Sequence, residues 1–240
     1  MVRNAAVLLA GLLLIGGALV SVRWLPAPAV PGAAAEDPTA AVLRGLLGGT
    51  RQSVANFLWI RGYLYWEERD TPGMENAKLW ALRLTPENKG FWKNTARVLA
   101  YDVPHWERRG AGEREPDTAL PPAPVRALFL LSVAESVFPD SPDFPVERGL
   151  ILLNVIGDRR AASNAFREAW ERPGAPYYTA RVHGELLRAE GKTGAAYRWY
   201  RELYPKLSDD NPAAAKPVIL RRIRALEDEL GVGVDERFVP

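Results

Sequence analysis

The sequence predicts an all-α protein, a solenoid of helical hairpins that follows an N-terminal transmembrane helix. Three observations support this prediction. An uncharged apolar stretch lies near the N-terminus, apolar residues recur at spacings of three and four through the remainder, and one pattern of small and large residues returns at nearly regular intervals. No stretch alternates with a period of two for long enough to predict a strand.

The N-terminal stretch from Ala5 to Val22 contains 18 uncharged residues with arginines on both sides. As a helix it is about 27 Å long, close to the roughly 30 Å of a hydrocarbon core, so residues 1–23 are predicted to be a membrane anchor. The flanking charges favour an N-terminus inside the cell, which places the body in the periplasm or outside the bacterial inner membrane. A signal peptide is the alternative, because Ala27-Pro28-Ala29 resembles a cleavage site.

The segment after the anchor and the overall composition limit the possible functions. Residues 24–37 are rich in proline and alanine, which predicts a tether. The 31 basic residues are interspersed with 29 acidic ones, so the chain carries no electrostatic footprint for nucleic acid. Cysteine is absent, which excludes disulfides, thiolate metal sites, cysteine nucleophiles and lipoprotein acylation.

Four repeats of two helices each are predicted between residues 55 and 206. In the second helix of a repeat, a small residue is followed four positions later by a large one and after three more by a small or apolar one. This signature recurs as Ala127/Leu131/Ala134, Ala162/Phe166/Ala169 and Ala196/Tyr200/Leu203. With Met74 as the first member of the first repeat, the spacings are 53, 35 and 34, and 53 equals 34 plus an insertion of 19. Such regularity indicates stacked helix pairs.

The repeats divide residues 38–231 into a single domain, which a tail at 232–240 follows. The predicted repeats are 55–88, 89–141 with an insertion at 103–124, 142–174 and 177–206, and a capping helix covers 211–231. The segment around Gly149 fits the first-helix spacing only if one residue is inserted.

The first predicted repeat, residues 55–88, resembles a known repeat family. Gly62, Tyr65, Ala81 and Pro86 stand where the tetratricopeptide pattern has glycine, tyrosine, alanine and proline. More narrowly, FLWIRGYLYW with the later RPGAP (172–176) and WYRELY (199–204) resembles a group of membrane-anchored bacterial repeat proteins. The resemblance implies a right-handed superhelix whose first helices line a concave groove, and it implies no activity.

Candidate binding residues lie on the first helices. Trp59, Tyr63 and Trp66 are spaced by four and three, about 100° around the helix from its packing residues, and the resemblance places them in the groove. In the alternative interpretation, a helix at 42–47 covers these rings as part of the core. The corresponding stripe of later repeats holds Lys93, Arg97, Arg181 and Arg188. These are either an ordinary solvated face or a site for an acidic peptide or a terminal carboxylate.

The insertion at 103–124 is rich in proline, glycine and charge and is too long for an ordinary turn between helices. It is predicted to be either a disordered excursion or a contact loop that presents Trp106.

No catalytic, metal or cofactor site is predicted. The only histidines are His105 and His183, which lie far apart in the sequence, and Gly191-Lys192-Thr193 lacks the earlier glycine and the strand of a phosphate-binding loop. We therefore expect an adaptor that holds other proteins of a membrane-associated envelope complex. The alternatives are a structural subunit of a secretion, pilus or transport machine, and an exported helical ligand-binding protein or enzyme.

Overall fold

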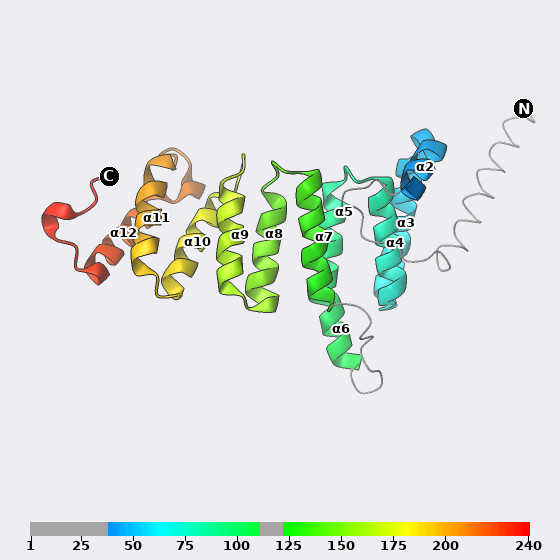
Figure 1. Ribbon diagram of the computed structural model, residues 1–240, viewed down its shortest axis with the longest axis horizontal. Coiled ribbons are helices and arrows are strands. Elements are labelled where there is room, and N and C mark those ends of the chain that lie inside the picture. Colours follow the sequence, from blue (N-terminus) through cyan, green and yellow to red (C-terminus); the bar gives the residue numbers. More distant parts are fainter. Residues whose placement is uncertain (1–37, 111–121) are drawn as a thin grey trace, which may run out of the picture. The chain divides into compact units, whose positions relative to one another are not determined.

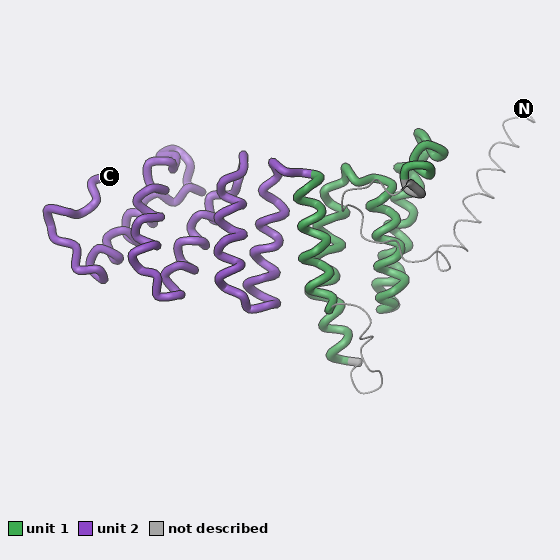
Figure 2. Tube along the Cα trace, in the orientation of Figure 1, with its two compact units in different colours: residues 1–137 green, residues 138–240 purple. Residues whose placement is uncertain are grey.

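The structure, a computed structural model, describes residues 38–110 and 122–240. This part of the chain is helical throughout and contains no strand, which confirms the all-α prediction (Figure 1). It forms two compact units that meet in sequence at Val137 and Phe138 (Figure 2). The predicted anchor and tether lie outside the described residues. Within the described ranges, no helix is long and apolar enough to cross a membrane.

Unit 1 contains six helices and two short connecting turns among its described residues. They are α2 (Pro38–Leu47), the 3₁₀ turn η1 (Gly48–Thr50), α3 (Arg51–Glu67), α4 (Thr71–Leu84), α5 (Lys89–Arg97), the π turn η2 (Val98–Asp102), α6 (Val103–Gly110) and α7 (Ala123–Val137). The chain reverses between α3 and α4 at Arg69, whose φ of 57° lies in the left-handed region. The Asp70 side chain then accepts a hydrogen bond from the Gly73 N–H and caps α4.

Residues 103–110 correct one prediction, because they are helical and not part of a loop. α5 continues through the π turn η2 into α6, which ends at Gly110. Pro104 stands inside this continuous helical segment, where it cannot donate a hydrogen bond to the carbonyl four residues earlier. The π turn η2 lies directly before it, and such a turn is one way in which a helix accommodates an interruption of its hydrogen bonds. The proline and the charges of this segment suggested a loop, yet they fit the exposed end of a long helix.

Unit 2 contains five helices and shorter turns. They are α8 (Asp143–Ile151), the π turn η3 (Leu152–Ile156), α9 (Arg159–Trp170), α10 (Tyr177–Ala189), α11 (Thr193–Leu203), α12 (Lys216–Leu230) and 3₁₀ turns at Tyr204–Lys206, Pro212–Ala214 and Val234–Glu236. The capping helix therefore starts at Lys216, later than predicted. Asn211 caps the preceding 3₁₀ turn through the Ala213 N–H, and α12 stops at Gly231 with a φ of 68°.

A glycine on the first helix of a pair faces a large side chain on the second. A Cβ at Gly149 would lie 3.1 Å from the Phe166 ring, and a Cβ at Gly184 would lie 2.6 Å from Tyr200 Oη. The missing Cβ atoms let the helices approach closely and let the rings fill the space between them. The single residue that the repeat spacing required after Gly149 is accommodated in η3, because a π turn contains one more residue than an α turn.

Candidate protein-binding site

The site is built around α3, which packs on α4 through Ala55, Leu58, Gly62 and Tyr65. Next to this buried stripe lie the three predicted aromatic residues. The ring of Trp59 stacks on Phe91 of α5, with centroids 4.1 Å apart and planes at 6°. Trp59 is half-buried in this position. The first predicted aromatic therefore belongs to the contact between α3 and α5.

Beneath Trp59 lies Lys78, a residue that sequence reasoning missed. It extends from α4 past Gly62, where a Cβ would lie 3.0 Å from its Cγ, and its side chain ends with Nζ 3.7 Å from the centroid of the Trp59 ring. Nζ donates a hydrogen bond of 2.9 Å to Asn94 Oδ1. Lys78 is only 3% exposed, and this burial lowers its pKa from 10.5 to about 8, although the nearby Asp102 charge acts in the opposite direction.

Lys78 takes the position that a large apolar or aromatic residue fills in the other repeats. It follows Met74 by four residues, as Leu131, Phe166 and Tyr200 follow the first members of their signatures. The sequence signal for Lys78 was a charged residue at the position where the other repeats have a large apolar or aromatic one. Because burying an ammonium group costs free energy, this substitution for an apolar residue needs an explanation outside packing.

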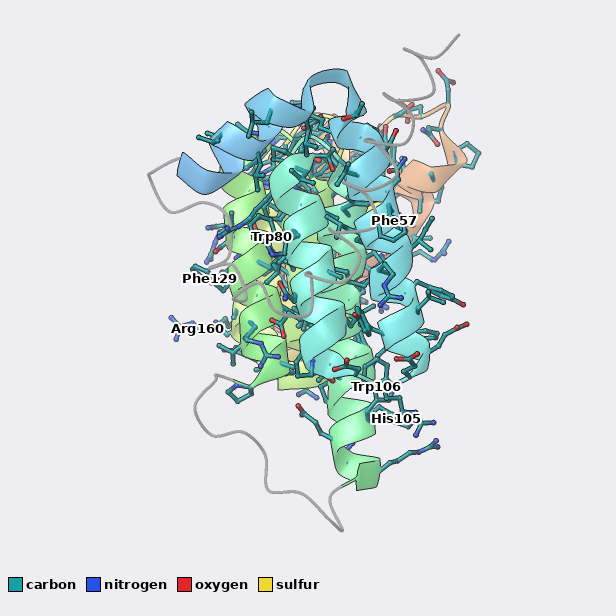
Figure 3. The ribbon with its side chains drawn as sticks, turned by 90° about the vertical axis from the view of Figure 1, so that its right-hand side faces the viewer. Phe57, Trp80, His105, Trp106, Phe129 and Arg160 are labelled. Carbon is teal, nitrogen blue, oxygen red and sulfur yellow. The ribbon has the colours of Figure 1, made fainter. Side chains whose placement is uncertain are left out.

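The second aromatic group lies near the C-terminal end of α3. Tyr63 stacks on Trp66 at 5.5 Å, and Trp66 Nε1 donates to Asp102 Oδ2 at 2.8 Å. Trp106 of α6 meets the Trp66 ring edge-on at 6.2 Å, so the predicted contact residue joins this group from a helix (Figure 3). Tyr63 remains 51% exposed. The neighbouring Glu67 side chain raises the pKa of Tyr63, through hydrogen bonding and through its charge.

The sequence also predicted, as an alternative, that a helix at 42–47 covers these rings, and the structure contradicts it. α2 packs on α4, where an Arg44 guanidinium N–H donates to the Arg83 carbonyl at 3.1 Å. The rings of Trp59 and Trp66 are covered instead by side chains of α5, η2 and α6. The helix at 42–47 therefore does not cover the aromatic stripe: two of its rings are half-buried against other elements of unit 1, and the third is exposed.

The predicted basic stripe is engaged in local interactions. In unit 2, Arg181 donates to the Ala213 carbonyl at 2.8 Å, and Arg188 Nε lies 3.5 Å from a carboxylate oxygen of Glu185. In unit 1, Lys93 and Arg97 lie on α5, and neither side chain is free of intramolecular interactions. Each of the four basic residues therefore has an interaction within its own unit, and a site for an acidic peptide or a terminal carboxylate stays a prediction.

The outer side of α3 is apolar as well, which sequence reasoning also missed. Ile60 is 58% exposed and Leu64 is 40% exposed, and Phe57 is partly exposed beside them. From Phe57 to Trp66, α3 therefore carries apolar or aromatic side chains on most of its sides, and Arg61 is the only charged residue of this run. The run FLWIRGYLYW (57–66) contains these residues, but the repeat pattern predicted a role only for the side of the helix that holds Trp59, Tyr63 and Trp66.

Unit 2 holds a buried histidine. Nδ1 of His183 lies 2.8 Å from Ser163 Oγ and 2.9 Å from Ser163 O, and the ring meets Trp199 edge-on at 4.5 Å. Burial is the largest influence on its pKa, which it lowers from 6.5. Without a carboxylate in hydrogen-bond contact, this arrangement is that of a histidine kept neutral within the core.

We expect His183 to make unit 2 less stable in acid. Between the lowered folded-state pKa and 6.5 the unfolded chain binds more protons than the folded one, so the free energy of unfolding falls as the pH falls through this window. Urea denaturation should show that the free energy of unfolding falls more between pH 7 and pH 5 in the wild type than in His183→Gln. His105→Gln, which changes an exposed residue of α6, serves as the control. Equal losses in the wild type and His183→Gln would contradict the expectation.

Among the described residues, no group of three or more histidine, aspartate or glutamate side chains is placed to hold a metal ion. Comparisons with protein families, with characterised proteins and with solved structures find no match for this chain.

Proposed function

We propose that the chain is a membrane-anchored adaptor of the tetratricopeptide type, a solenoid of helical hairpins that holds other proteins of an envelope complex. In this proposal residues 5–22 span the bacterial inner membrane once, and the helical body lies in the periplasm or outside. Partner proteins bind the inner face, which we define as Trp59, Tyr63, Trp66 and Trp106.

The observation that carries the proposal is the group of aromatic rings on one side of α3. Tyr63 is 51% exposed and stacks on the half-buried Trp66, so this side of the helix presents an aromatic surface within unit 1. Aromatic residues on such a surface are the usual anchors of protein interfaces. The glycine and large-residue pairs of Gly149 with Phe166 and Gly184 with Tyr200 support the repeat assignment, since the same contact recurs in successive helix pairs.

Tyr63 provides the direct test. We expect Tyr63→Ala to weaken partner binding by about 2 kcal/mol, roughly thirtyfold, because an exposed anchor contributes to an interface far more than to folding. The measurement is co-purification of the full chain from mild detergent with mass spectrometry of the bound proteins.

The matched control is Phe129→Ala on α7, where the ring is 49% exposed in the same unit. A protein retained by the wild type and by Phe129→Ala but lost from Tyr63→Ala supports the proposal. Partners that bind all three forms equally would show that binding does not use the inner face.

A further inference from the structure

The chain turns back on unit 2 after its last helix. Residues 232–240, which we call the C-terminal strap, follow α12 at the end of this unit (Figure 1). Most of the strap is exposed, and Val239 is 83% exposed. Two neighbouring residues, Arg237 and Phe238, are partly buried and bring the strap into contact with the last two helices. The backbone is extended at Arg237, with φ of −65° and ψ of 147°.

Phe238 is held through its peptide group and through its ring. The backbone N–H donates to Glu227 Oε1 of α12 at 2.6 Å. The ring meets Tyr204 edge-on with centroids 5.4 Å apart, and the guanidinium of Arg201 lies 5.8 Å from the centroid of the Phe238 ring. These contacts suit an aromatic side chain on an extended segment, because one group recognises the ring and another the backbone that carries it.

The surface that receives Phe238 is held in place by partners outside the strap. Glu227 is fully buried, and Arg224 donates to its Oε2 at 2.7 Å. The Tyr197 hydroxyl of α11 donates to Glu227 Oε1 at 3.2 Å. Lys216 Nζ lies 4.8 Å from the centroid of the Tyr204 ring. Because these contacts all join α11, α12 and the turn after α11, the receiving surface does not depend on the strap for its shape.

The strap fills this surface only in part. Beside the Phe238 ring lies an open cavity of about 310 Å³, which Arg198, Arg201 and Glu202 of α11 also line. The second attachment of the strap is the ion pair of Arg237 with Asp228, at 2.6 Å and partly exposed at both ends, and exposed ion pairs contribute little to stability. A core segment is packed without such space, so the fit is that of a ligand held mainly by one side chain.

We propose that α11 and α12 carry a second protein-binding site, which takes an extended partner segment with an aromatic side chain, and that the C-terminal strap occupies this site until such a segment displaces it. The inference goes beyond the proposed function, because it uses unit 2 alone and needs neither the anchor nor the inner face. A strap on so short a tether acts as an intramolecular competitor, with an effective concentration on the order of millimolar. It therefore excludes segments that bind weakly.

A synthetic peptide of residues 232–240 with a fluorophore tests the inference against the full chain. Phe238→Ala removes the ring that holds the strap and leaves the receiving residues of α11 and α12 unchanged. By fluorescence anisotropy, we expect the peptide to bind Phe238→Ala about tenfold more tightly than it binds the wild type, where the strap competes. The matched control is Val239→Ala at the exposed neighbouring position, which should bind as the wild type does. A peptide carrying Phe238→Ala should bind none of these chains.

Three results would overturn the inference. Equal binding of the peptide by the wild type and by Phe238→Ala would show that the strap and the peptide do not share a site. A Phe238→Ala chain that keeps its helical circular dichroism but binds no peptide would show that the surface takes no segment from outside. Loss of helical circular dichroism in Phe238→Ala would show that the strap is part of the core of unit 2. None of these results bears on the inner face, which Tyr63→Ala tests separately.

Discussion

Replacing Lys78 with methionine is expected to stabilise unit 1 by about 3 kcal/mol at pH 7, an unusual direction for a change in a core. The lysine pKa falls from 10.5 to about 8 on folding because of burial. A difference of this size means that the charged lysine lowers the free energy of unfolding by about 3 kcal/mol at pH 7. Methionine is unbranched and of similar length, so it can follow the same path past Gly62. Buried charges replaced by well-packed apolar residues often leave a protein more stable.

The pH dependence makes this prediction specific. Between about pH 8 and 10.5 the unfolded chain holds more protons than the folded one, so the wild type becomes more stable as the pH rises through that window. The advantage of Lys78→Met should therefore shrink toward zero by about pH 10.5. Urea denaturation from pH 7 to pH 10.5 measures it, with Lys89→Met, at an exposed lysine of the same unit, as the control. A Lys78→Met variant that is less stable than the wild type at pH 7 would refute the argument.

A stabilised Lys78→Met variant would also separate folding from function. The ammonium group lies against Trp59 and Asn94, beside the inner face, and its charge is the feature that distinguishes this repeat from those with Phe166 and Tyr200. If Lys78→Met folds better but loses the partner that Tyr63→Ala also loses, the lysine serves binding. If it keeps the partner, the lysine has no part in the inner face.

The sequence predicted the helix pairs well, because their signature is a packing rule. A small residue opposite a large side chain lets two helices approach closely, and this rule can be read without coordinates at Gly149 with Phe166 and at Gly184 with Tyr200. The prediction was wrong at 103–110, where composition suggested a loop. There the contact of Trp106 with Trp66 and the π turn that precedes Pro104 outweigh local composition.

The candidate site was less predictable, because exposure depends on which neighbours a helix acquires. The spacing of Trp59, Tyr63 and Trp66 predicted one stripe on α3, but their different degrees of burial come from Phe91 and from α6, which approach from other parts of the chain. Lys78 was missed for the same reason. Its burial depends on α3 and α5 together, and a helix pattern read alone gives a lysine its usual place in solvent.

Replacing Gly184 with alanine is expected to destabilise unit 2 by about 1 to 3 kcal/mol, although alanine is the better helix former. The new Cβ would lie 2.6 Å from Tyr200 Oη and 2.7 Å from its Cε1, closer than any ordinary contact. Tyr200 is only 1% exposed, and its hydroxyl lies 3.0 Å from Glu185 Oε1 and 3.1 Å from the Arg181 carbonyl. The ring therefore cannot move aside without losing a buried hydrogen bond, and the two helices must separate instead.

Gly194→Ala is the matched control, because it makes the same change in the neighbouring helix of the same pair. At that position the nearest atom to a new Cβ is the end of the flexible Arg198 side chain, at 3.8 Å. The helix preference of alanine then acts alone and should stabilise unit 2 by up to about 1 kcal/mol. Thermal melts of the two variants should thus shift in opposite directions from the wild type. A Gly184→Ala variant that melts at or above the wild-type temperature would show that α10 and α11 do not pack through the contact of Gly184 with Tyr200.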